Sequence, residues 1–467
     1  MTELHYRSLS DVCRQLKSGE LSSVEVTKHQ LQRIEALEPT LKSMAMVIAE
    51  SALARAAELD SVRDRGEPMG ALHGVPIGVK DLLFTEGLVT ASGTQVMANF
   101  VPDHDATVVA KLKAAGAVIV GKTQLTEGAF GAHHPSIECP RNPYNHEHWP
   151  GVSSSGSGAS VAAGLVFGAL GSDTGGSIRF PSASCGLVGI KPTYGRVSRF
   201  GAFPLSETLD HIGPMTRTVE DAARMLAVIA GQDPNDSTSL DAPVPNYMDC
   251  SDDIRGLRIG VDWRYASMGV RDEVIAGTRD AVAALEALGA EVVEIEIPAD
   301  YKTLVEEWGI TCGVDCAKAH AGMFPEQAAL YGPSLARLLE LGLNVDRTRY
   351  NELEVIRANF RQALDQILER VDMIAAPCMT TLPPTIAEME AEGGFDEPDL
   401  APFITFTAPF DYSGHPTITL PIGQHASGLP LSFQLVGRYL EEGTLIQAGL
   451  AFERQVGAMP HPKEPHP

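Results

Sequence analysis

Apolar and polar residues alternate at helical spacing over the first 65 positions. Four apolar residues recur three or four positions apart from Leu9 to Leu16, and Gly19 follows where a helix would end. Ser22 with Glu25 matches the capping-box pattern that opens a helix. Residues 46–65 are rich in Ala and Glu, which are strong helix formers. The pattern predicts a helical N-terminal segment over residues 1–65.

The pattern changes at residue 72, after which short apolar runs bounded by Gly and Pro predict buried strands. These runs are VPIGVK at 75–80, AVIVGKT at 117–123 and LVFGALGSD at 165–173. A helical pattern at 106–115 separates the first two runs. Strands that alternate with helices predict an α/β fold.

The second half of the chain continues in the same manner. Residues 256–298 predict a strand, a helix and a second strand, and residues 300–370 predict helices. Residues 372–377 and 417–437 return to the sheet. No repeat and no convincing linker divides the chain, so we expect a single domain over residues 1–467.

Glycine and serine dominate residues 151–201, and two segments there carry candidate chemistry. They are PGVSSSGSG at 150–158 and GSDTGGSIR at 171–179. Glycines let the backbone approach a substrate closely, and several exposed N–H groups together stabilise a tetrahedral oxyanion. A flexible linker would lack the apolar positions at 161–166, which predict a helix directly after the first serines.

A serine hydroxyl is a weak nucleophile unless a base removes its proton. Neither segment contains a histidine, and the nucleophile-elbow pattern G-x-S-x-G is absent around Ser153 and Ser157. Lys80 ends an apolar strand, where burial would lower its pKa toward neutrality and suit it to act as the base. The residues therefore favour a serine nucleophile with a lysine base.

Three stretches resemble the amidase signature family. They are GVPIGVKDLL from residue 74, the serine segment 150–164, and GSDTGGSIRFPSASCGLVGIKPTYGRVSRFG from residue 171. The resemblance extends from about residue 9 to 455 and is densest over 72–215. It implies a mixed central sheet sandwiched between helices, with hydrolysis of a small or medium amide, anilide or carbamate and with no cofactor.

The resemblance also assigns roles to individual residues. Ser177 matches the nucleophile that forms an acyl-enzyme, Ser153 matches a serine that follows a cis peptide bond and relays the proton, and Lys80 matches the general base. The matching positions further imply an oxyanion hole from Thr174, Gly175, Gly176 and Ser177, supporting hydroxyls from Ser154 and Ser172, and an ion pair between Asp173 and Arg179 that holds the loop. We expect the substrate pocket to include Glu127, Gly128, Ala129, His133 and Trp149, with residues 300–370 forming a variable substrate-side region.

The serine segment departs from the family pattern at two positions. The family reads G-G-S-S-G-G-S, whereas this chain reads G-V-S-S-S-G-S, so that Val152 and Ser155 replace glycines. Val152 stands directly before the cis bond that the resemblance implies, and a non-proline cis bond already costs about 3–4 kcal/mol. The geometry at Ser153 is therefore the point that the sequence leaves open.

Three other functions compete with a stand-alone amidase. One of the subunits of an amidotransferase would use the same chemistry to supply ammonia to a partner, although residues 333–350 do not resemble that group. A non-catalytic binding protein could share the fold, but the three candidate catalytic residues argue against it. Residues 116–123 match the P-loop pattern G-x4-G-K-[ST], but the run AVIV within them predicts a strand where a P-loop needs its loop.

Metal binding has little support in the sequence. Cys312 and Cys316 form a C-x3-C pair without a second pair, which is weak as a metal site. His133, His134, His146 and His148 lie in one segment, and we interpret them as loop residues near the mouth of the site rather than as ligands. We therefore expect no metal.

Charge and composition narrow the partners and the location. The net charge of −24 argues against nucleic acid and against anionic membranes, because their phosphates would be repelled. The N-terminus lacks the pattern of a signal peptide, and no stretch of 18 apolar residues occurs. Seven scattered cysteines fit a reducing compartment. We expect a cytoplasmic protein, and the resemblance suggests a homodimer.

Overall fold

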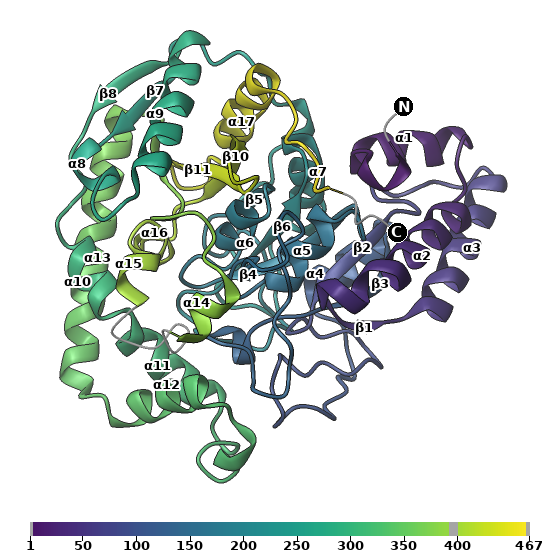
Figure 1. Ribbon diagram of the computed structural model, residues 1–467, viewed down its shortest axis with the longest axis horizontal. Coiled ribbons are helices and arrows are strands. Elements are labelled where there is room, and N and C mark those ends of the chain that lie inside the picture. Colours follow the sequence, from purple (N-terminus) through teal and green to yellow (C-terminus); the bar gives the residue numbers. More distant parts are fainter. Residues whose placement is uncertain (1–2, 392–399, 464–467) are drawn as a thin grey trace.

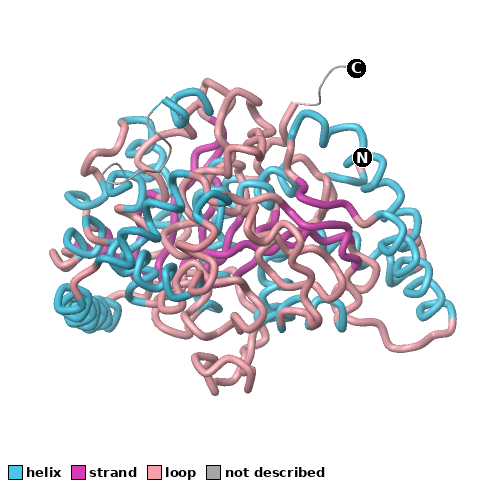
Figure 2. Tube along the Cα trace, turned by 90° about the horizontal axis from the view of Figure 1, so that it is seen from below, coloured by secondary structure: helices cyan, strands magenta, loops and turns pink. Residues whose placement is uncertain are grey.

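A computed structural model describes residues 3–391 and 400–463. Its described strands form one sheet of eleven, in the spatial order β1-β3-β2-β4-β6-β5-β10-β11-β9-β7-β8. The strands cross the interior of the molecule, and helices and loops lie outside them (Figure 2). The strands are β1 (Met44–Val47), β2 (Pro76–Lys80), β3 (Val118–Thr123), β4 (Gly168–Asp173), β5 (Val188–Lys191), β6 (His211–Thr216), β7 (Arg258–Val261), β8 (Glu291–Glu294), β9 (Met373–Pro377), β10 (Thr417–Gln424) and β11 (Pro430–Gly437).

The sheet is mixed. Strand β2 runs parallel to both of its neighbours, β3 and β4, and at the far edge β7 runs parallel to β8 and β9. Between these groups the pairs β4–β6, β6–β5, β5–β10, β10–β11 and β11–β9 are antiparallel. The expected α/β fold with a mixed central sheet flanked by helices is confirmed.

The helices flank the sheet along its whole width. Helices α1 to α3 lie at the β1 end of the molecule, and α13 lies at the opposite end, near β7 and β8 (Figure 1). The helices are α1 (Leu9–Ser18), α2 (Ser23–Leu41), α3 (Ala49–Asp64), α4 (Thr107–Ala114), α5 (Ser155–Ala162), α6 (Arg179–Ser184), α7 (Val219–Ile229), α8 (Trp263–Ala266), α9 (Asp272–Ala287), α10 (Tyr301–Glu306), α11 (Trp308–Ala319), α12 (Pro333–Asn344), α13 (Arg347–Arg370), α14 (Ile386–Ala391), α15 (Leu400–Ile404), α16 (Ala408–Ser413) and α17 (Glu442–Val456), with short 3-10 turns η1 (Leu4–Tyr6), η2 (Glu127–Ala129), η3 (Tyr247–Asp249) and η4 (Ala328–Leu330).

The N-terminal helices begin and end where the sequence places their signals. Gly19 caps α1 in the left-handed conformation, and Ser22 with Glu25 forms a capping box at the start of α2. The prediction of one helix over 46–65 is wrong at its start, because residues 44–47 form the edge strand β1 and α3 begins only at Ala49. Antiparallel pairing with β3 supplies the hydrogen bonds that stabilise β1. The local sequence does not predict this pairing.

The helix predicted after the first serines, by contrast, begins earlier than expected. Helix α5 includes Ser155 and Ser157 and ends at Ala162, before the rest of the apolar stripe. All eight of its residues are buried, and only small side chains permit this close packing. A Cβ on Gly156 would lie 2.2 Å from the carbonyl oxygen of Ser43, so the helix needs glycine there. The remaining strands and helices predicted from residue 72 onward lie where the pattern indicates.

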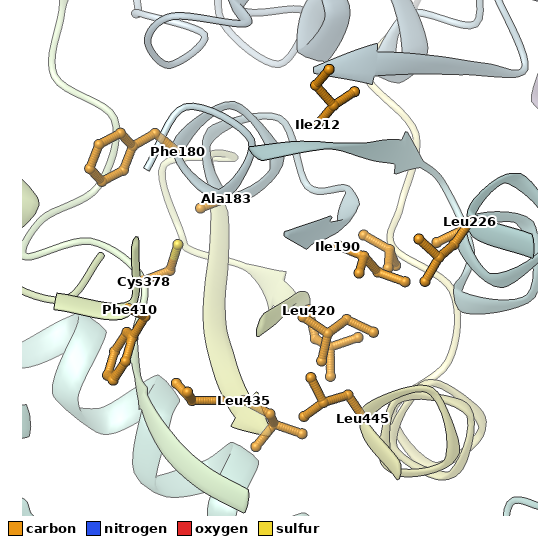
Figure 3. Packing of buried hydrophobic residues seen from close by; sticks show 14 of the residues in the cluster. Phe180, Ala183, Ile190, Ile212, Leu226, Cys378, Phe410, Leu420, Leu435 and Leu445 are labelled. Atoms are coloured by element: carbon orange, nitrogen blue, oxygen red, sulfur yellow. The ribbon is translucent and has the colours of Figure 1, made fainter. Parts of the chain in front are cut away.

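The core is continuous from the first to the last third of the chain. Ile190 and Leu420 from neighbouring strands β5 and β10 pack near Leu445 of α17, while Phe180 and Ala183 lie above the sheet on α6 (Figure 3). Each of these side chains is nearly or fully buried. The packing therefore ties residues that follow the candidate nucleophile to the C-terminal strands and helix.

No helix in the described ranges has both the length and the apolar character that a membrane span needs.

Candidate active site

The candidate catalytic residues lie at the carboxyl ends of two adjacent parallel strands. Lys80 is the last residue of β2, and Ser172 and Asp173 end β4. The register pairs Val79 with Leu170, which brings the two strand ends to the same edge of the sheet. Crevices at the carboxyl ends of parallel strands are common ligand sites in α/β proteins. The serine segment 150–154 and helix α5 come close to this edge.

Lys80 is fully buried and surrounded by hydroxyl groups. Its Nζ lies 2.7 Å from Ser153 Oγ, 2.8 Å from Ser154 Oγ and 2.9 Å from Ser172 Oγ. Hydroxyl groups can accept from the ammonium and can also donate to the neutral amine. This cage of three hydroxyl groups can therefore form hydrogen bonds with both the charged and the neutral form of Lys80.

Burial lowers the pKa of Lys80 to about 7, although the carboxylates of Asp173 and Asp210 act in the opposite direction. The desolvation of an ammonium in a dry site is the dominant cause. A large fraction of Lys80 is therefore neutral near pH 7, which is the state that a general base requires.

The peptide bond between Val152 and Ser153 is cis, as the resemblance implies. Val152 is buried and lines the cavity beside Ser177. The second replaced glycine, Ser155, begins α5, and its hydroxyl lies 3.2 Å from His133 Nε2.

Ser177 lies on the loop between β4 and α6, with 8% of its surface exposed, whereas Ser153 is fully buried. The two serine segments touch where the Ser154 amide donates to the Ser177 carbonyl oxygen at 3.4 Å. Ser177 lines the cavity, whereas Ser153 contacts Lys80.

The loop 174–177 presents fewer free N–H groups than the resemblance implies. The Gly176 amide donates to Asp173 Oδ1 at 2.7 Å, so this N–H is already occupied. Within the described part of the chain, the amides of Thr174, Gly175 and Ser177 donate to no other residue. Gly176 has φ +133°, and a Cβ there would lie 2.5 Å from the Phe180 ring, so the loop requires glycine at this position.

A buried ion pair holds this loop, as the sequence predicts. Arg179 donates to both carboxylate oxygens of Asp173, from Nη2 at 2.8 Å and from Nε at 3.0 Å. Burial alone would raise the pKa of Asp173, but Arg179 holds it well below the usual range. Asp411 of α16 also accepts from Arg179 at 2.7 Å. Removing one partner of such a buried set typically costs about 3–5 kcal/mol.

Three supports of the loop were not identified from the sequence. Trp308 Nε1 donates to the Thr174 carbonyl oxygen at 3.2 Å, and Thr407 Oγ1 donates to the Gly175 carbonyl oxygen at 2.5 Å. Asp210 accepts from Thr174 Oγ1 at 2.6 Å. These residues lie 36, 134 and 232 positions from their partners in the loop, and only the fold brings them together.

Three cavities meet around Ser177. The cavity at Ser177 itself has about 30 Å³, and its wall is mainly apolar, with side chains from Phe130, Val152, Phe180, Leu205, Trp308 and Ile404. It shares Gly131 with a larger cavity of about 740 Å³ and shares Ala129 and Leu205 with one of about 220 Å³. The site thus combines a tight apolar centre with two wider spaces.

The expected pocket residues divide between these spaces. Ala129 lines the cavity at Ser177, and Glu127, His133 and Trp149 line the 740 Å³ cavity. Burial raises the pKa of Glu127 to about 7, and its carboxylate accepts from the Gly332 amide at 2.9 and 3.0 Å. Gly128 is not among the residues that line these three cavities, and a Cβ added to it would lie 2.8 Å from the Leu335 side chain.

The competing motifs are explained by the structure. Residues 118–123 of the P-loop match are strand β3, and Lys122 is buried against Asp81 at 3.2 Å, so the segment offers no phosphate-binding loop. Cys312 and Cys316 are both buried on α11. In residues 3–391 and 400–463, no group of three or more His, Cys, Asp or Glu side chains could hold a metal ion.

Comparisons with known proteins agree with this architecture. A model of the amidase family matches residues 25–446. AmiD of Mycobacterium tuberculosis, a putative amidase by name, is 43% identical over 450 residues, covering 96% of this chain and 94% of AmiD. One chain of the glutamyl-tRNA(Gln) amidotransferase of Roseiflexus sp. (strain RS-1) is 40% identical over 485 residues, covering 97% of each chain.

A solved structure of 6-aminohexanoate cyclic dimer hydrolase complexed with substrate has a TM-score of 0.88 and 28% identity, covering 97% of this chain and 98% of the other. The chain belongs to the amidase family. It is a hydrolase that acts on amide bonds.

Proposed function

We propose that this hydrolase cleaves amides through a triad of Ser177, Ser153 and Lys80 and an acyl-enzyme intermediate. The observation that carries the proposal is the buried Lys80 Nζ, which lies 2.7 to 2.9 Å from three serine hydroxyls. A lysine in this cage has no charged partner within hydrogen-bond distance among the described residues, and it has a pKa near neutrality. Lys122 of the neighbouring strand β3 differs, because it forms an ion pair with Asp81 at 3.2 Å.

The proposed reaction has two halves. Neutral Lys80 accepts a proton from Ser153, which accepts one from Ser177, and Ser177 Oγ forms a bond to the substrate carbonyl carbon. The N–H groups of Gly175 and Ser177 stabilise the oxyanion. The C–N bond then breaks, and the proton returns through Ser153 to the leaving amine. Water attacks the resulting ester by the same route, which releases the acid and restores Ser177.

The shape of the site favours an uncharged group next to the scissile carbonyl. The cavity at Ser177 has an apolar wall that includes Phe130 and Trp308, whose rings stack at 6.1 Å. Burying a charge there without a partner would cost several kcal/mol. The 740 Å³ cavity is wide enough for the remainder of a medium-sized amide, anilide or carbamate.

A component of an amidotransferase is the second candidate, and the whole-chain similarity to the Roseiflexus amidotransferase favours it. Such a component would release ammonia from glutamine to a partner enzyme. Hydrolysis of anilides by the isolated chain, together with purification without a second protein, would exclude it. Turnover of glutamine alone, and only in the presence of a partner, would replace the amidase proposal.

The proposal extends to assembly and location. By analogy with relatives, we propose a cytoplasmic homodimer that does not bind nucleic acid, and the net charge of −24 supports the last part. Light scattering after size-exclusion chromatography tests the dimer: a monomeric mass of 49.8 kDa would exclude it.

A serine-reactive fluorophosphonate tests the nucleophile without knowledge of the substrate. The reagent phosphonylates only serines that a neighbouring base activates. We expect one adduct per chain in the intact mass and, after peptide mapping, its location on Ser177. A folded protein without an adduct, or with the adduct on another serine, would refute the triad.

The pH dependence follows from the pKa of Lys80. Because the base must be neutral, the protonated form below pH 7 is inactive, and kcat/KM is expected to fall about tenfold per pH unit on the acid side of a pKa of about 7. The measurement is kcat/KM for an anilide between pH 5 and pH 9. A rate that stays constant down to pH 5 would exclude Lys80 as the base.

A further inference from the structure

Asp210 joins the candidate oxyanion loop to a second loop of the site. Its carboxylate accepts from Thr174 Oγ1 at 2.6 Å, from the Leu205 amide at 3.0 Å and from the Ser206 amide at 3.1 Å. Leu205 lines the cavity at Ser177. One carboxylate therefore fixes both the start of the loop 174–177 and one wall of the cavity.

The second loop is itself anchored to helix α11. Asp315 of α11 accepts from Ser206 Oγ at 2.7 Å and from the Thr208 hydroxyl and amide at 2.8 and 3.1 Å. The same helix contributes Trp308, whose Nε1 holds the Thr174 carbonyl oxygen. Thr174 is thus held at its side chain and at its backbone by two connections that lead to one helix.

Asp210 also faces the lysine side of the site. It lines the 220 Å³ cavity, whose wall includes Ser172, and Ser172 Oγ accepts from Lys80 Nζ. Its negative charge raises the pKa of Lys80, as does that of Asp173. Burial raises the pKa of Asp210 itself to about 6, so it is mainly ionised at pH 7. The other charged or titratable groups that act on Asp210, or on which it acts, are Arg199, Tyr194 and Cys316.

We propose that Asp210 is a positioning residue for amide hydrolysis, which holds Thr174 so that the free N–H groups of the loop point at the oxyanion. The inference rests on the proposed function of Ser177 and Lys80. Misplacement of a reacting group by about 1 Å costs on the order of 100-fold in rate, so a tether at this position controls kcat. The charge of Asp210 has a separate effect, because it keeps the proton affinity of Lys80 from falling further.

Two substitutions separate the tether from the charge. Thr174→Val removes the hydroxyl at nearly constant volume and keeps the carboxyl group of Asp210, although the loss of this hydrogen bond raises the pKa of Asp210. Asp210→Asn removes the charge and one acceptor for the backbone amides of the second loop. Asp236→Asn is the matched control, because Asp236 lines the same cavity but its carboxylate binds Arg199 and Thr238 rather than the oxyanion loop.

The readout is the rate of fluorophosphonate labelling of Ser177 as a function of pH. Thr174→Val is expected to slow labelling about 10- to 100-fold. Its acid limb, which is the fall in rate toward low pH, is expected to move less than that of Asp210→Asn, because the carboxyl group of Asp210 is still present. Asp210→Asn is expected to slow labelling to the same degree and to move the acid limb down by about 0.5–1 pH unit, because Lys80 loses a negative neighbour. The double variant is expected to be no slower than Asp210→Asn alone, and Asp236→Asn to keep the wild-type limb.

The outcomes distinguish a failure of the role of Asp210 from a failure of the triad. One outcome overturns the role of Asp210 and leaves the triad intact. In that outcome Ser177 is labelled in the wild type, and the Asp210→Asn variant is labelled at the same rate and with the same acid limb. A folded wild type that is not labelled overturns both. If Asp210→Asn does not fold, Thr174→Val decides: labelling at the wild-type rate excludes the tether.

Discussion

Replacement of Ser177 by alanine is expected to lower amide hydrolysis at least about 10⁴-fold while the protein stays folded. In the proposed mechanism the hydroxyl oxygen forms the acyl bond, so no neighbouring group is expected to replace it in the first half of the reaction. Ser177 is 8% exposed and lies on a loop held by Asp173, so the loss of one oxygen leaves the packing intact. The measurement is kcat with an anilide substrate, alongside circular dichroism and thermal unfolding.

Ser182→Ala provides the matched control. Ser182 lies on α6, directly after the nucleophile loop, and its hydroxyl donates to the Ile178 carbonyl oxygen at 2.8 Å. That oxygen also accepts from the Ser182 amide, so the substitution leaves no buried group without a partner. We expect Ser182→Ala to keep more than half of the wild-type rate. Substantial hydrolysis by a folded Ser177→Ala variant would show that another nucleophile acts.

Loss of Lys80 is expected to be the second largest effect, at about 10²–10⁴-fold in kcat/KM. Lys80→Met keeps the length of the side chain but removes the amine that accepts the proton. Residues of one catalytic unit act together, so the double variant with Ser177→Ala is expected to be no slower than the single serine variant. The measurement is kcat/KM at pH 8, where the wild-type lysine is mostly neutral.

Lys80→Arg distinguishes a base from a structural cation. Arginine keeps the positive charge and offers hydrogen bonds to the serines, but its pKa is too high for it to become neutral in the working range. If Lys80 acts as a base, Lys80→Arg is as slow as Lys80→Met. If the arginine variant keeps more than a tenth of the wild-type rate, Lys80 contributes charge and not proton transfer.

The parts of the fold that the sequence predicts best are those determined by local pattern. The parallel strands that end at Lys80 and Asp173 lie in apolar runs bounded by Gly and Pro. Strands buried on both faces have such continuous apolar sequences. Edge strand β1 was missed because its residues are only half buried, so their pattern carries little information about pairing.

The candidate site shows the same division. Sequence analysis found the two glycine-serine segments and the lysine because each belongs to a short, contiguous motif. Asp210, Trp308 and Asp411 were not singled out, because each acts through a contact with a loop distant in sequence. Gly176 marks a second limit: its amide matches an oxyanion donor by position, but the structure commits it to Asp173. The hydrogen bonds that form in the folded protein, and not the position of a residue in a motif, determine which amides remain free.

The bridge from Arg179 to Asp411 has a consequence for the order in which a working site can arise during synthesis. Its two ends are 232 residues apart in the chain, so a ribosome that has just completed the nucleophile loop must translate for roughly another 10–50 s before the second carboxylate exists. Until then the guanidinium has one carboxylate, and the Thr407 contacts to Arg179 and Gly175 are also missing. Lys80, Ser153 and Ser177 are all made early, but the contacts that Thr407 and Asp411 make to the loop and to Arg179 form only when the last third of the chain docks.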